Sequence, residues 1–200
     1  MKAFNGYDEA KVNKGSEAFE QLPKGAYVCK ILNVREQPNK KGGSRFDIMF
    51  DIAEGEYKDF YSKQYQERKK DNEDAKFPND GIYRLTIPED DSEDWLKNAF
   101  KTFTTALEDS NSGYHWDWDE KKWKGKLFGG LFHVKQTEYN GNIYDHTQLK
   151  WVRSAADVRE NKYGKLPNDK LIDSEKSNPN APNDDFVNVP DGSADEIPFE

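Results

Sequence analysis

The strongest constraint on the fold lies late in the chain, where two long strand-forming runs are separated by a short turn. The runs span residues 127–138 and 143–153, and Asn140-Gly141 lies between them. Asn-Gly favours the type I′ turn of a two-residue hairpin loop, because both central positions of that turn need a positive φ. The sequence therefore predicts an antiparallel β-hairpin, and with it an antiparallel sheet.

Four further runs predict strands. Residues 26–34 are apolar and β-branched, as in a strand that is buried on much of both faces, and residues 81–87 form a shorter run that ends at Pro88. Residues 45–52 and 57–65 alternate with a period of two, which puts one set of side chains on one face of a strand. The alternating sets are Phe46, Ile48, Phe50 and Ile52 in the first run and Tyr57, Asp59, Tyr61, Lys63 and Tyr65 in the second.

One helix is expected between residues 92 and 110. Its apolar side chains recur at helical spacing, after acidic and capping residues that suit a helix N-terminus. The apolar set is Trp95, Leu96, Ala99, Phe100, Phe103, Ala106 and Leu107. The charged segment 68–80 is expected to be a loop. Short strands with one helix predict a mainly β fold, an OB-like five-stranded barrel or a curved sheet.

The end of the chain differs in composition from the rest. Beyond about residue 165 it is rich in Pro, Asn, Ser and Asp, and it has too few apolar side chains to offset the entropy of ordering. Residues 171–200 hold eight acidic side chains and Lys176, so that they carry −7 of the total charge of −8 and residues 1–170 carry −1. We therefore expect a polar lead-in at 1–22, an OB-like domain at 23–165 and a disordered acidic tail at 166–200.

Several classes of site are disfavoured by the sequence. Cys29 is the only cysteine, which excludes an intramolecular disulfide and a cysteine-based zinc site. His115, His133 and His146 have carboxylates nearby but form no compact metal motif, so we expect polar strand faces there, with no metal and no cofactor. No apolar segment of the length of a signal or a membrane span is present, and an intracellular, cytoplasmic protein without membrane contact is expected.

Tyrosines and lysines that share strand faces indicate a nucleic-acid-binding surface. Bases stack on tyrosine whatever their identity, and neighbouring cations neutralise phosphates. The candidate residues lie in a basic loop, in the 57–70 region and in the second hairpin. They are Lys40, Lys41, Arg45, Tyr57, Lys58, Tyr61, Lys63, Tyr65, Arg68, Lys69, Lys70, Lys135, Tyr139, Tyr144, Lys150, Trp151 and Arg153. The alternative is that these rings form cross-strand pairs beside solvated lysines, and composition alone favours neither.

The last residues combine carboxylates with a small apolar end. Acidic segments of this kind can dock in a pocket with a basic rim, whereas a merely solubilising tail has no use for apolar residues at its end. The candidate partner-binding residues are Asp195, Glu196, Ile197, Pro198 and Phe199.

This tip resembles the acidic tip of bacterial single-stranded-DNA-binding proteins, which recruits replication and repair enzymes; here Glu200 follows the phenylalanine. The body is similar to a family of phage-encoded single-stranded-DNA-binding proteins over residues 22–27, 138–144 and 149–154. The resemblance implies an OB-like fold, binding with little sequence preference, and a role in phage replication or recombination inside the host cytoplasm.

The leading hypothesis is a non-enzymatic protein that coats single-stranded DNA and recruits replication or recombination proteins through its tail; a homo-oligomer is compatible with it. A metal-dependent nuclease is an alternative, because Asp90 could pair with Asp119-Glu120-Lys121. The acid-x-Lys pattern also occurs at residues 56–58, 67–69, 74–76 and 160–162 of this charged chain, which weakens that alternative. An acidic interaction protein that mimics DNA is the third hypothesis.

Overall fold

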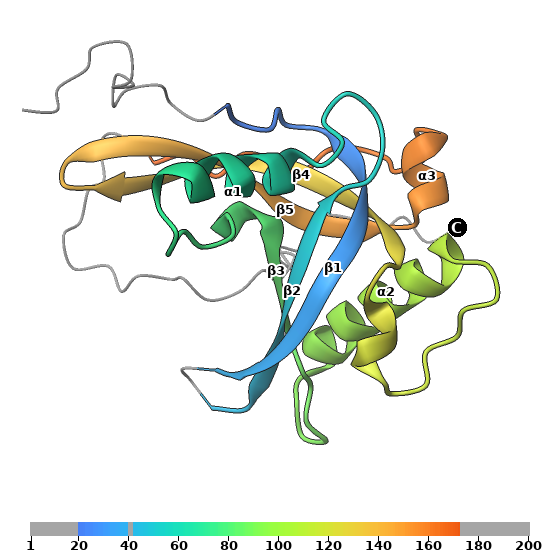
Figure 1. The fold of residues 1–200 in the computed structure, drawn as a ribbon. Coiled ribbons are helices and arrows are strands. Elements are labelled where there is room, and N and C mark those ends of the chain that lie inside the picture. Colours follow the sequence, from blue (N-terminus) through green and yellow to red (C-terminus); the bar gives the residue numbers. More distant parts are fainter. Residues whose placement is uncertain (1–19, 40–41, 173–200) are drawn as a thin grey trace, which may run out of the picture.

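The computed structural model describes residues 20–39 and 42–172. Within these residues, five antiparallel strands form one sheet in the order β3-β2-β1-β4-β5 (Figure 1). The strands are β1 (Ala26–Pro38), β2 (Ser44–Ile52), β3 (Ile82–Thr86), β4 (Leu127–Tyr139) and β5 (Asn142–Arg153). The helices are α1 (Phe60–Asp71), α2 (Asp94–Ser110) and α3 (Ala155–Arg159), with short 3-10 turns η1 (Asn79–Gly81) and η2 (Glu120–Trp123). The expected mainly β fold is confirmed.

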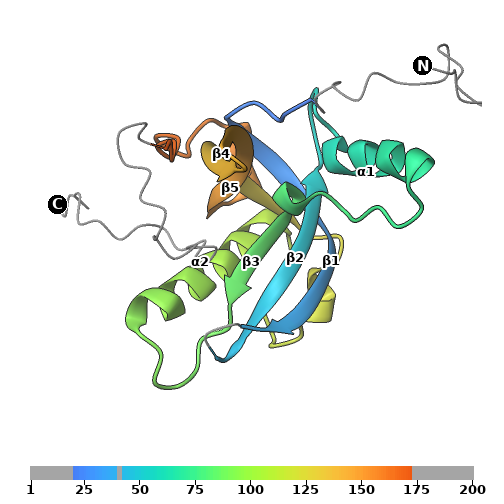
Figure 2. The same cartoon turned by 90° about the vertical axis from the view of Figure 1, so that its left-hand side faces the viewer.

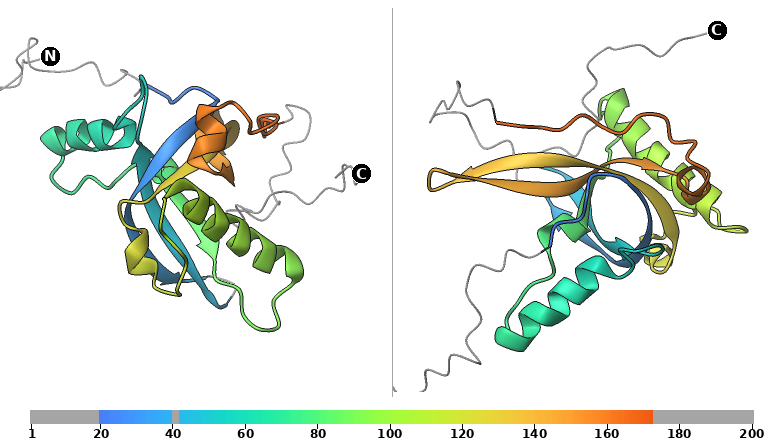
Figure 3. Two further views of the ribbon diagram at one scale, coloured as in Figure 1. Left: turned by 90° about the vertical axis from the view of Figure 1, so that its right-hand side faces the viewer. Right: turned by 90° about the horizontal axis from the view of Figure 1, so that it is seen from above.

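The strand order contains a Greek key. Strands β1, β2 and β3 pair in succession, and β4 returns to pair with the other edge of β1. β1 pairs with β4 over Ala26–Lys30 and with β2 over Cys29–Pro38, with a bulge between Ile31 and Asn33 in the pairing with β2. A bulge bends a strand and increases its twist, and the sheet is strongly curved around β1 (Figure 3).

The predicted hairpin is confirmed. β4 pairs with β5 as far as Tyr139 and Asn142, and Asn140 and Gly141 have φ angles of 51° and 76°, as a type I′ turn requires. β4 pairs with β1 only as far as Leu131, so the distal part of the hairpin projects beyond the other strands (Figure 1). We call residues 134–147 the hairpin arm.

The alternation in β2 points into the core, as predicted. Phe46, Ile48, Phe50 and Ile52 are all buried. The predicted helix is confirmed as α2, which packs Phe103 and Leu107 into the same cluster. α1 and α2 lie on opposite sides of the curved sheet (Figure 2), so each can form a different surface with it.

The prediction of a strand at residues 57–65 is wrong. The prediction of a loop over residues 68–80 is also wrong, because α1 continues to Asp71. The chain turns at Asp59, which has a φ of 60°, and α1 begins at Phe60. The buried carboxylate of Asp51 on β2 accepts hydrogen bonds from the backbone N–H groups of Ile52 (2.8 Å), Tyr61 (2.9 Å) and Ser62 (2.8 Å). It therefore satisfies N–H groups that a helix N-terminus leaves unpaired, and its charge suits the helix dipole.

The boundary expected for the tail at residue 166 is also wrong. Pro167 is buried, and Lys170 forms backbone hydrogen bonds with Val134 (2.8 Å) and Gln136 (2.9 Å) of β4. β1 leaves this part of the β4 edge uncovered, so its polar backbone groups are available for residues 168–172, which we call the strap. The expected acidic tail after residue 172 and most of the expected lead-in lie outside the described residues.

Within residues 20–39 and 42–172, no helix is long and apolar enough to cross a membrane.

Candidate nucleic-acid interface

A cavity of about 430 Å³ lies between α1, η1 and the hairpin arm. It brings together four residues that the sequence singled out: Tyr61 and Arg68 of α1, Lys135 of β4 and Tyr144 of β5. We call it the arm cleft. Its lining residues are Glu20, Gln21, Leu22, Phe60, Tyr61, Gln64, Arg68, Pro78, Asn79, Asp80, Lys135, Thr137, Tyr144, Asp145, His146, Thr147 and Gln148.

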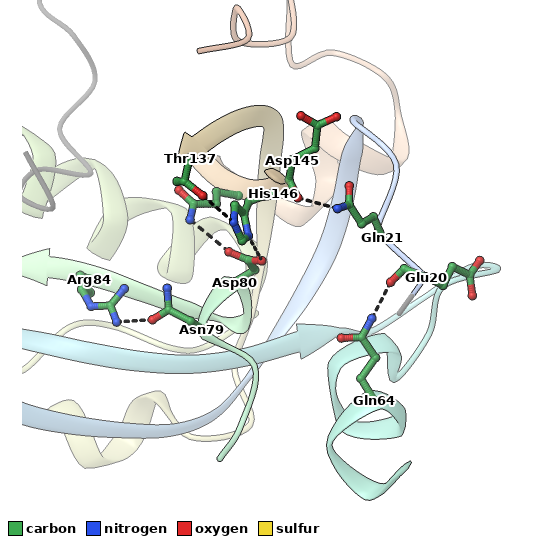
Figure 4. Close-up of polar contacts among 10 residues, drawn as sticks. Glu20, Gln21, Gln64, Asn79, Asp80, Arg84, Thr137, Asp145 and His146 are labelled. Atoms are coloured by element: carbon green, nitrogen blue, oxygen red, sulfur yellow. Dashed lines mark hydrogen bonds and ion pairs between the residues drawn. The ribbon is translucent and has the colours of Figure 1, made fainter. Parts of the chain in front are cut away.

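Hydrogen bonds to Asp80 hold the arm against η1 (Figure 4). Gln148 Nε2 donates to one carboxylate oxygen of Asp80 (3.0 Å), and His146 Nδ1 lies 3.3 Å from the other. His146 Nε2 is 2.9 Å from the hydroxyl of Thr137 on β4. Because η1 leads directly into β3, these side chains connect the two edge strands of the sheet and fix the position of the arm.

The segment before β1 connects α1 to the hairpin arm. Gln64 of α1 donates to the carbonyl oxygen of Glu20 (2.6 Å), and Gln21 donates to the carbonyl oxygen of Asp145 on the arm. Figure 4 shows both contacts. The side chain of Leu22 is buried beside them. α1 and the arm are therefore joined by a segment that precedes both in sequence.

Large side chains are exposed near the tip of the arm. Tyr139 is 68% exposed, Ile143 52% and Tyr144 47%. Tyr144 lies opposite Thr137 in the hairpin register, and Tyr139 lies opposite Asn142. Packing does not require rings in these positions, and Tyr144 offers a surface for stacking in a cavity that Lys135 and Arg68 also line.

Arginines gather on the outer face of β1–β3. Arg45 Nε lies 2.7 Å from Asp47, and Arg84 Nε lies 3.9 Å from the same carboxylate oxygen. Arg35 is the register partner of Asp47 on β1. Arg84 also donates to Asn79 of η1 (2.5 Å), at the edge of the arm cleft. Two guanidinium groups near one carboxylate, with Arg35 at the facing register position, leave an excess of arginine over aspartate among these residues.

Tyr61 is a packing residue, so its prediction as a base-stacking residue is wrong. It is 2% exposed and makes edge-to-face contacts with Phe50 and Phe60. Burial raises the pKa of Tyr61 well above its usual range. Because α1 is a helix, Tyr61 and Tyr65 do not share a strand face. Tyr57 packs against Tyr27, and the half-buried ring of Tyr65 packs against Phe77.

The lysines of the 57–70 region are exposed, and several have local partners. Lys63 Nζ donates to the carbonyl oxygen of Lys58 (2.8 Å), and Lys69 Nζ lies 5.4 Å from the centre of the Tyr65 ring. Lys70 pairs with Glu67 (2.6 Å). Cations in the last turn of α1 also suit the helix dipole, which gives them a structural role besides any ligand contact.

The remaining candidates do not line the arm cleft. Trp151 packs against the small cluster around Val28, Leu131 and α3, and the guanidinium group of Arg153 lies 6.0 Å from its ring. Lys150 lies next to Trp151 on β5. The candidates Lys40 and Lys41 lie outside the described residues, as does the segment from Asp195 to Phe199.

Within the part of the chain that the structure describes, no three His, Cys, Asp or Glu side chains are arranged to hold a metal ion. His133 is buried, and its Nδ1 lies 2.9 Å from the carbonyl oxygen of Asn168 in the strap. Burial lowers the pKa of His133. His115 contacts Glu108, while Lys122 pairs with Asp117.

Sequence reasoning missed Arg35, Arg84, Asp80 and Gln148. Arg84 could have been found, because it alternates with the apolar residues of β3 in the same way as Arg45 and Asp47 alternate in β2. The role of Asp80 depends on how closely η1 approaches β5, which no local pattern reveals.

No known protein-family model matches the chain, and a search of curated proteins finds no relative.

Proposed function

We propose that this protein binds single-stranded DNA with little sequence preference, as a coating protein rather than an enzyme, and that its body is an OB-like domain. The strand order and the position of α2 between β3 and β4 support the second part. An OB fold is a five-stranded, partly open Greek-key barrel that binds oligonucleotides on the face of β2 and β3 and through its β1–β2 and β4–β5 loops. Those loops correspond to residues 39–43 and to the tip of the arm.

The observation that carries the proposal is the arm cleft. Arg68 of α1 is far in sequence from Lys135 and Tyr144 of the hairpin arm, and the three residues line one cavity. The cavity also has the side-chain amides of Gln64 and Gln148, whose Nε2 atoms donate to Glu20 and Asp80 and whose oxygen atoms are of a kind that can accept from bases. The arginine-rich outer face of β1–β3 continues from its edge at Asn79. A strand that crosses this region could stack a base and neutralise phosphates along one path.

Preference for single strands follows from the rings. Tyr139 and Tyr144 can stack only on bases that are not already stacked in a duplex. Residues 1–170 carry a net charge of −1, so long-range attraction to the denser phosphates of a duplex is weak.

The proposal also includes a role for the tail. Its end, from Asp195 to Phe199, is proposed to recruit a replication or recombination protein. Carboxylates next to Ile197 and Phe199 suit a pocket with an apolar floor and a basic rim.

Fluorescence anisotropy tests the DNA-binding proposal. A dye-labelled oligo(dT) and a labelled hairpin duplex of equal length are titrated at ~0.05 M and ~0.3 M salt, with and without Mg²⁺. We expect tighter binding to oligo(dT), an affinity that falls as salt rises, and no cleavage. Equal affinity for the duplex contradicts the proposal. Cleavage that requires Mg²⁺ supports the nuclease hypothesis, and absence of binding supports the DNA-mimic hypothesis.

A further inference from the structure

A second cavity, of about 550 Å³, lies between α2, the end of β3 and the connector that precedes η2. Aromatic side chains form its walls: Phe46, Phe100, Trp116 and Trp118. None of its lining residues also lines the arm cleft. We call it the aromatic pocket.

Trp118 is held in an unusual state at the mouth of this pocket. Its side chain is 80% exposed, although its ring stacks on Phe100 with centroids 6.4 Å apart and planes 15° apart. Its φ is 65°, in the left-handed region that a bulky side chain rarely adopts. The fold thus strains the backbone and leaves most of a large apolar side chain in water, which indicates a binding role rather than packing.

The charges around the aromatic pocket are mainly negative. Glu89, Asp90 and Glu120 line it, and residues 87–95 contain five carboxylates and no Lys or Arg. Lys97 and Lys101 are the cations of the lining, and Lys97 Nζ donates to the carbonyl oxygen of Asp90 (2.8 Å). Because the acidic segment adjoins the lining, a cation has more oppositely charged partners here than a phosphate.

We infer that the aromatic pocket docks a segment of a partner protein in which an apolar side chain is flanked by arginine. The apolar side chain would contact Phe46 and Phe100. The guanidinium group would lie on the free face of Trp118 and pair with Glu89, Asp90 or Glu120, because arginine both stacks on aromatic rings and pairs with carboxylates. This goes beyond DNA binding, since it gives the body a protein-binding surface separate from the arm cleft.

A tryptophan-free peptide probe tests the inference on the full chain. The peptide acetyl-Ser-Phe-Arg-Leu-Arg-Ser-amide is titrated by intrinsic tryptophan fluorescence and by calorimetry. Its matched control has glutamate in place of both arginines, and oligo(dT) is the third ligand. We expect saturable binding of the arginine peptide, no binding of the glutamate peptide, and a loss of about tenfold in affinity in Trp118→Ala. Trp95→Ala, which removes an exposed tryptophan outside the pocket, is the matched variant and should bind like the unaltered protein.

Three results overturn the inference. They are absence of saturable binding of the arginine peptide, equal binding of the two peptides, and equal affinity of Trp118→Ala and the unaltered protein. If oligo(dT) binding instead depends on Trp118, the pocket is a nucleic-acid site. The melting temperature of Trp118→Ala separates loss of binding from loss of fold, and the double variant Glu89→Gln/Asp90→Asn tests the charges without removing a ring. Failure of the inference leaves the oligo(dT) result for the arm cleft untouched.

Discussion

The arm cleft and the aromatic pocket differ in chemistry although one sheet supports both. The arm cleft has Arg68, Lys135 and three carboxylates among amides and hydroxyl groups, and an arginine-rich face adjoins it. The aromatic pocket has four aromatic walls, three carboxylates and two lysines. α1 borders the first and α2 the second, on opposite sides of the sheet. The two linings have the same balance of Asp and Glu to Lys and Arg, so the different ligands that we propose follow from the aromatic walls and from what adjoins each cavity, arginines in one case and the acidic segment 87–95 in the other.

The largest effect is expected from Tyr61→Ala. The buried ring packs against Phe50, Phe60 and Phe77, so its loss should lower the free energy of unfolding by about 3–5 kcal/mol. Urea denaturation measures this change. Tyr144→Ala is the control, because its exposed ring should leave stability nearly unchanged. A stable Tyr61→Ala variant that loses oligo(dT) affinity would restore Tyr61 as a DNA contact.

Asp51→Ala tests whether α1, which forms one wall of the arm cleft, can be destabilised without loss of the aromatic pocket. Its carboxylate accepts three backbone hydrogen bonds at the start of α1, and we expect a loss of about 2–3 kcal/mol in the free energy of unfolding. Oligo(dT) affinity should fall, while binding of the arginine peptide to the aromatic pocket should persist at temperatures where the variant is folded. Asp59→Asn is the matched control, since the Asp59 side chain makes no capping bond and Asn tolerates a positive φ. Equal stability of the two variants contradicts the role of Asp51.

Tyr144→Ala tests the arm cleft itself. Loss of one stacked base should weaken oligo(dT) binding by about 1–3 kcal/mol. Tyr65→Ala is the matched control, because Tyr65 packs on Phe77 and does not line the cleft. If the two variants lose the same affinity in an anisotropy titration, the arm cleft is not the principal contact.

The smallest effect is expected from the tail. Truncation after Ile172 removes a net charge of −7 and should strengthen oligo(dT) binding by about threefold at low salt, with less change at physiological salt, where screening shortens to ~8 Å. Weaker binding after truncation contradicts this expectation.

Phe199→Ala separates charge from docking, because it leaves the charge of the tail unchanged. It should keep oligo(dT) affinity and lose capture of a purified replication or recombination partner. Phe186→Ala is the matched variant elsewhere in the tail, and it should retain the partner. If Phe199→Ala also retains the partner, the tip is not a docking motif.

The elements that the sequence predicted are those whose signals are local. The Asn140-Gly141 turn, the alternation in β2 and the apolar spacing in α2 each lie within the element that they define. α1 was missed because its N-terminus is capped by Asp51, which lies on another element, the strand β2. The spacing of Tyr57, Tyr61 and Tyr65 also fits one face of a strand, although the segment is not a strand. Tyrosines four residues apart also lie on one face of a helix.

The site was predicted one residue at a time but not as an arrangement. Arg68, Lys135 and Tyr144 were all candidates, yet their convergence depends on the helical state of α1 and on the contact of Asp80 with β5. The aromatic pocket was not predicted, because the exposure of Trp118 depends on a backbone conformation that its residue type disfavours.

The strap determines where the acidic end of the protein is tethered. The chain leaves the described body at Ile172, whose N–H donates to the side chain of Gln136 on β4 (3.1 Å). The following 28 residues can span at most about 100 Å. If DNA binds beside the arm as proposed, a protein captured by Asp195–Phe199 would therefore share a small volume with it. Such a tether gives an effective concentration on the order of millimolar, so a partner with weak affinity for DNA of its own could still act on the bound strand.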